Sequence, residues 1–265
     1  MSGFLQLLAA GNIISLTPSF TPGSQLFSSS GTFSVPSGTT SLTIEIWGGG
    51  GGGGQGFSGN GGSSPTGGTA GGNSSVTTFS PNIVAGGGGA GGAGEWSTYC
   101  FCCGLPNGYV NGGVGGSRPT VSGPAGIVTQ NGALPSILKG GTNQPGGSNT
   151  PFGGKGGTPS SGLYNDGGIG GAQVAAGTAG NDATNYGAGG SGSGGSTSGG
   201  PNPPDWGGSG GGGGNSGGYV KYVITSSIPS SIVYLIGARG SHSVYNGTFP
   251  NSGYGSNGAI RFTYS

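Results

Sequence analysis

Two stretches of the chain, one near each end, alternate apolar and polar residues. In residues 41–47 (SLTIEIW) every second position is Leu or Ile, and in residues 259–264 (AIRFTY) Ile260 and Phe262 fall on one face. Period-two alternation predicts half-buried β-strands. Further strands are predicted at residues 32–35, 75–79 with 83–84, 219–225 and 231–236.

These strands are expected to form a small antiparallel sandwich in which the first and last strands pair. Ile228–Pro229–Ser230, between two predicted strands, predicts a hairpin turn. Residues 12–27 hold Pro18 and Pro22 and are expected to form an extended, irregular connector.

Glycine accounts for 74 of the 265 residues and is concentrated in residues 48–74 and 86–218. Collagen needs glycine at every third position, and residues 196–198 (STS) break that spacing. Two arrangements stay open: long glycine-rich loops, or a polyglycine-type bundle of extended three-residue-per-turn helices whose backbone groups pair with neighbours. The predicted fold class is all-β, a small antiparallel sandwich or jelly-roll-like domain with such loops or such a bundle.

The rest of the composition argues against the third alternative, disorder. The chain has 10 Tyr, 10 Phe and 3 Trp, which disordered Gly/Ser chains usually lack. Only 6 basic and 5 acidic residues are present, and they are scattered. The sequence therefore offers no basic patch of the kind that binds nucleic acid. A nearly uncharged surface promotes association and precipitation of a free monomer, so it favours a protein that is part of a larger assembly.

Side chains that could carry catalysis are sparse, and we expect no enzyme, cofactor or metal site. His242 is the single histidine, and its neighbour Ser241 points elsewhere in an extended segment. The positions of the five Asp and Glu residues do not indicate a catalytic pair. Lys155 lies among glycines but lacks the following Ser or Thr of a phosphate loop.

The cysteines form one cluster, and all three lie within residues 100–103 (CFCC). The spacing matches no zinc pattern, and three thiols cannot close a disulfide set within one chain. Reduced thiols, inter-subunit disulfides and a shared metal site stay open. The possible inter-subunit thiols are Cys100, Cys102 and Cys103.

The N-terminal residues 1–27 are expected to be a separate arm before a glycine-rich β domain at residues 28–265. Residues 4–10 are apolar but far too short to span a bilayer, and they lack the basic start of a secretory signal. The segment either tucks against its own domain or docks onto a neighbouring subunit. The candidate docking residues are Phe4, Leu5, Gln6, Leu7 and Leu8.

Residues 31–54 (GTFSVPSGTTSLTIEIWGGGGGGG) closely resemble a glycine-rich domain of phage and large-virus proteins, and so do residues 84–89, 218–220 and 258–264. This resemblance implies a virion structural or attachment role. Separately, residues 3–11 (GFLQLLAAG) resemble the opening of major capsid proteins of large nucleocytoplasmic DNA viruses, whose N-terminal arm precedes a double jelly roll. The chain is too short for that double jelly roll.

The two resemblances and the sparse chemistry predict a non-enzymatic minor capsid protein of a large DNA virus, docked to the capsid lattice by its arm. Its partners would be the major capsid protein, other virion proteins and further copies of itself, and its location the virion, assembled in the host cytoplasm. No membrane span is expected. The alternative is a phage tail-tip or fibre adhesin that binds a bacterial surface receptor through residues 95–110, 181–186 and 201–206. Ice binding is disfavoured because no regular array of Thr or Ala is present.

Overall fold

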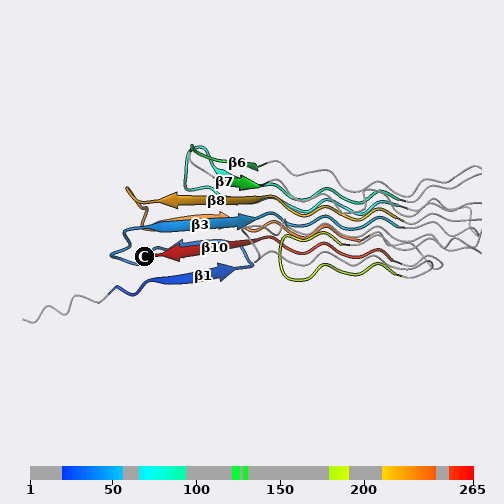
Figure 1. Ribbon diagram of the computed structural model, residues 1–265, viewed down its shortest axis with the longest axis horizontal. Coiled ribbons are helices and arrows are strands. Elements are labelled where there is room, and N and C mark those ends of the chain that lie inside the picture. Colours follow the sequence, from blue (N-terminus) through cyan, green and yellow to red (C-terminus); the bar gives the residue numbers. More distant parts are fainter. Residues whose placement is uncertain are drawn as a thin grey trace, which may run out of the picture.

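The computed structural model describes residues 20–55, 66–93, 121–125, 128–130, 179–190, 211–242 and 251–265. These residues form two five-stranded antiparallel sheets and no helix, so this part of the chain is all-β (Figure 1). Sheet A has the order β1 (Gly23–Phe27), β10 (Ala259–Tyr264), β3 (Leu42–Trp47), β8 (Tyr219–Ile224) and β7 (Val128–Gln130). Sheet B has the order β2 (Gly31–Ser34), β9 (Ser231–Leu235), β4 (Ser74–Val76), β5 (Ile83–Ala85) and β6 (Val121–Ser122).

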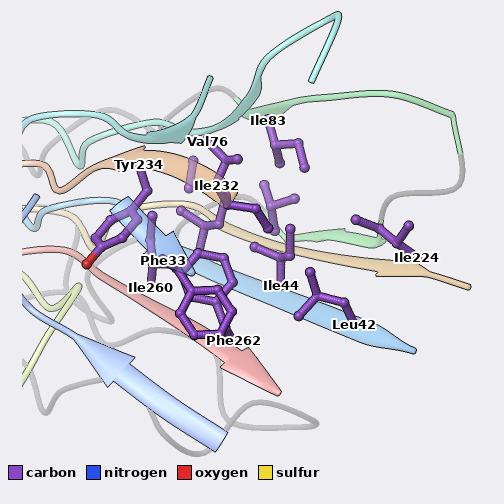
Figure 2. Close-up of a cluster of buried hydrophobic side chains, with 13 residues drawn as sticks. Phe33, Leu42, Ile44, Val76, Ile83, Ile224, Ile232, Tyr234, Ile260 and Phe262 are labelled. Atoms are coloured by element: carbon purple, nitrogen blue, oxygen red, sulfur yellow. The ribbon is translucent and has the colours of Figure 1, made fainter. Parts of the chain in front are cut away.

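One hydrophobic core takes side chains from both sheets. The alternating residues of β3 and β10 point inward and are fully buried, as the pattern predicted. The rings of Phe33 from sheet B and Phe262 from sheet A stack at 4.4 Å (Figure 2). Fully burying each such side chain stabilises the fold by roughly 1.5–3 kcal/mol. The core therefore ties the two sheets together.

Three expectations about the strands were wrong. Residues 23–27 are not irregular but form β1, which pairs with β10 along its whole length. The first and last strands do pair, as predicted, but the first strand is β1 and not residues 32–35, which contribute to β2 and pair with β9. Residues 228–230 do not close a hairpin, because β8 lies in sheet A and β9 in sheet B.

Glycine-rich segments continue from the strands and pack side by side, and we call their described parts the glycine bundle. Residues 48–55 lie at its centre. Successive N–H groups of residues 48–55 donate to three neighbouring segments in turn, so that every third N–H donates to the same segment. The donor–acceptor pairs are Gly48–Gly218, Gly51–Asn215 and Gly54–Gly212; Gly49–Gly72, Gly52–Thr69 and Gln55–Thr66; and Gly50–Ser256 and Gly53–Gly253.

Three other segments donate to the carbonyl groups of the central segment. Gly88 and Gly91 donate to Gly49 and Gly52, at 2.8 and 2.9 Å. Residues 187–190 and 237–242 approach it from other sides, through Gly190 and Gly240. The acceptor segments run antiparallel to residues 48–55, because their partner numbers fall as the donor numbers rise. The segment at residues 86–93 runs parallel to it.

This packing leaves no space for a side chain at many interior positions. A Cβ atom on Gly48, Gly51 or Gly54 would overlap a carbonyl oxygen of residues 86–92. The buried side chains in the bundle are mostly small and polar, as at Ser252 and Ser256. The glycine content of the described bundle is thus explained by the close approach of backbones, which only glycine permits.

Candidate functional site

The described molecule has two unlike ends. At the end that we call the base, the Phe20 ring lies 6.2 Å from the Tyr264 ring, and the Ser265 carbonyl accepts the N–H of Thr40 at 2.8 Å. β1 runs from the base toward the bundle, and β10 returns antiparallel to it (Figure 1). Residue 20 and the C-terminal residue therefore both lie at the base.

The other end, the tip, is where the described bundle segments stop. The segments that stop there include residues 48–55, 86–93 and 237–242, which run outward, and residues 211–218 and 251–258, which return. Five sequence stretches begin or end at the tip. Three of them do so at both ends, namely residues 56–65, 191–210 and 243–250. The other two, residues 94–120 and 131–178, each have one end at the tip and the other at the sheets, next to Val121 and Gln130. The five stretches hold Phe57, Trp96, Tyr99, Phe101, Tyr109, Phe152, Tyr164, Trp206, Tyr245 and Phe249.

A charged and aromatic cluster lies on the outer face of sheet A. Glu45 and Arg261 are cross-strand neighbours whose charged groups lie 3.5 Å apart, and Tyr219 donates to Glu45 at 2.8 Å. Arg261 also donates to the Tyr186 hydroxyl at 3.2 Å, and the Tyr186 ring packs against Trp47. The cluster fastens residues 183–188 to the sheet.

Residues 181–186 are one of the stretches that the adhesin alternative named. Four of the six are exposed, whereas the Tyr186 ring is partly buried and packs against Trp47. Residues 185–187 make the turn, with positive φ angles at Asn185 and Gly187. The turn lies beside the strands, away from the tip.

A second cluster lies on the side of the bundle around Tyr254. The Arg239 guanidinium lies 4.0 Å from the centre of the Tyr254 ring. The His242 ring packs edge-on against the same Tyr254 ring, with the two ring centres 3.9 Å apart. The Asp182 carboxylate accepts the Tyr254 backbone N–H at 2.8 Å. These contacts join three bundle segments. His242 thus contributes to packing between bundle segments.

Ser241 does not pair with His242. The Ser241 hydroxyl lies 2.9 Å from that of Thr69, on a neighbouring bundle segment. Among the described residues, no group of three His, Cys, Asp or Glu side chains could hold a metal ion. In the core, burial raises the pKa of Tyr234 above its ordinary value of 10.0.

The site residues suggested by the sequence lie outside the described residues. These are the docking residues Phe4, Leu5, Gln6, Leu7 and Leu8 and the thiols Cys100, Cys102 and Cys103. The two clusters described above were missed in the sequence. Their members are far apart along the chain, and a weak signal was the three-residue spacing of the larger side chains Asn251, Tyr254 and Asn257. Within the part of the chain that the structure describes, no helix is long and apolar enough to cross a membrane.

No protein-family model matches the chain, and no curated protein matches it either.

Proposed function

We propose that this chain is a non-enzymatic structural protein of a virus particle, a minor capsid protein of a large DNA virus docked through its N-terminal arm. The observation that carries the proposal is that the two ends of the molecule, the base and the tip, differ. Residues 1–19 join the described structure at the base, and each of the long connecting stretches joins it at the tip by at least one end. A protein held at its base would direct its tip away from the particle.

The finer architecture fits that role. In our interpretation the two sheets form a sandwich that serves as a rigid base, and the bundle is of the polyglycine type, with three residues per turn. Such helices rise about 3.1 Å per residue, so the eight residues 48–55 would extend the molecule by about 25 Å. Because their hydrogen bonds run between segments, the bundle forms a cross-linked spacer rather than a set of loose loops.

A deletion of residues 2–11 tests the docking. We expect the variant to fold but to be lost from purified particles, because the apolar residues 4–8 are missing. Retention at normal occupancy would overturn docking through the arm. Immunogold labelling of intact particles with an antibody to residues 90–110 checks the orientation. Label over the shell of the particle supports the proposal, whereas label that appears only after disruption contradicts an outward tip.

The second candidate function is attachment to a host surface by a tail-tip or fibre adhesin. The aromatic residues of the connecting stretches favour it, since Trp and Tyr are enriched where proteins bind other molecules. Binding of the purified protein to host envelope fractions tests this function. A variant with Trp96 and Trp206 changed to Ala should bind at least about tenfold more weakly. Absence of binding to every envelope fraction argues against attachment.

A further inference from the structure

No strand of the described part of the chain covers the outer edge of β1. β1 is the first strand of sheet A, and among the described residues only β10 pairs with it. Proteins usually protect such an edge with Lys, Pro or a bulge, because free N–H and C=O groups invite another strand. β1 (GSQLF) has no charged residue and no proline, and its register with β10 runs unbroken from Gly23 to Phe27. The edge therefore lacks the usual protection.

The side chains of β1 suit an added strand. Leu26 is on the outer face of the sheet and is 49% exposed, although it is a large apolar residue. Ser24, on the same face, lies 3.0 Å from the Thr263 hydroxyl. An incoming strand that alternates apolar and hydroxyl residues would match this face.

The chain upstream of β1 offers such a strand. Residues 12–17 (NIISLT) contain β-branched and apolar residues, carry no charge, and end before Pro18. Phe20, the first described residue, packs inward against Tyr264 and approaches Gly38 on the core side of β1, so the described chain enters β1 from that side and not along its outer edge. A neighbouring molecule is the better source.

We propose that residues 12–17 of a second copy of this chain add to the open edge of β1 as an antiparallel strand. This rests on the proposed function, since it names what the N-terminal arm contacts within the particle. β1 runs from the base toward the bundle, so an antiparallel arm runs toward the base. It can then enter its own domain at Phe20 while both tips point the same way. Pairing β1 with a second β1 in antiparallel fashion would instead turn one tip backward.

Association of the full-length protein, measured by light scattering, gives the first test. We expect multimers, and Leu26→Lys should weaken their association at least about tenfold, because it places an ammonium group against the added strand. Val223→Lys is the matched control, since Val223 is also 49% exposed and lies on the same sheet, on β8 away from the edge. A monomeric wild-type protein, or equal effects of the two substitutions, overturns the proposal.

Cross-linking identifies the occupant of the edge. In a variant whose three cysteines at residues 100–103 are replaced by Ser, Ser15→Cys and Ser24→Cys are placed on separate chains with different tags and mixed under oxidation. A disulfide that joins the two tags supports exchange of arms. With both substitutions in one chain, a disulfide that stays within that chain shows that the arm covers its own edge and overturns the proposal. Ser122→Cys, at the exposed β6, replaces Ser24→Cys in the control.

The two proposals fail separately. Arm exchange is disproved if Leu26→Lys leaves the multimer intact, whether or not the protein is found in particles. The virion role is disproved if the protein forms arm-linked multimers but is missing from purified particles.

Discussion

Replacing Gly50 with Ala tests whether close backbone packing holds the bundle together. A Cβ atom at this position would stand closer than 3.0 Å to the carbonyl oxygen of Ala188, a separation that real Cβ atoms essentially never show. The two segments must move apart. The hydrogen bonds at risk are those from Gly50 to Ser256 at 2.8 Å, from Gly240 to Gly50 at 2.7 Å and from Ser256 to Ala188 at 2.8 Å.

The cost follows from these bonds. Each buried backbone group left without a partner costs about 1–3 kcal/mol, and two or three groups are affected. The lower entropy of the unfolded Ala chain offsets about 0.4–1 kcal/mol. We therefore expect Gly50→Ala to lower the free energy of unfolding by about 3–5 kcal/mol.

Urea unfolding, followed by circular dichroism and tryptophan fluorescence, measures this free energy. Ala70→Ser is the control, because it adds one atom at an exposed position of the bundle. Gly67→Ala should fall between them, since its Cβ would lie 3.1 Å from the nearest atom, the Gly91 oxygen. A loss below about 1 kcal/mol for Gly50→Ala would refute the reasoning, because it would mean that the bundle opens without loss of hydrogen bonds.

Three further predictions concern the sheets. Phe262→Ala removes a fully buried ring that stacks on Phe33 and should cost about 3–5 kcal/mol in urea unfolding; a loss like that of an exposed residue would contradict the shared core. Tyr186→Ala should shift tryptophan fluorescence to longer wavelength by exposing Trp47, whereas Tyr186→Phe keeps the ring and should leave it unchanged; equal spectra for both would show that the cluster does not cover Trp47. Burial raises the pKa of Tyr234 in the folded state, so its contribution to stability is present below pH 10.0 and is lost as the pH rises through the folded value. The free-energy difference between wild type and Tyr234→Phe should therefore change above pH 10.0 and stay constant below it, and a constant difference throughout would contradict the shift.

The sequence predicted the strands whose local pattern is strong, and missed those that depend on distant partners. Residues 42–46 and 260–263 alternate between buried and more accessible positions, and both lie in strands. β1 has no such pattern, since most of its residues are exposed and its strand conformation depends on pairing with β10. The assignment of β8 and β9 to different sheets likewise depends on contacts that no local turn signal encodes.

The candidate site was less predictable than the strands. Hydrogen bonding between glycine segments was one of two open arrangements in the sequence, and the described bundle has it. Which segments are neighbours could not be predicted, because glycine has no side chain whose size or polarity would indicate its partner. The contacts of Tyr186 and Tyr254 were missed for the same reason: their partners are brought together by the backbone packing of the bundle.

The period of three in the bundle restricts how its length can change. Inserting one or two residues into residues 48–55 would rotate everything beyond the insertion by about one third or two thirds of a turn, and donors would face the wrong neighbours. Inserting three residues restores the rotation and extends that segment by about 9 Å. All neighbouring segments must lengthen with it to keep their partners. Such proteins should therefore lengthen during evolution by concerted in-frame steps of nine nucleotides in several segments, and the reach of the tip should change in discrete increments.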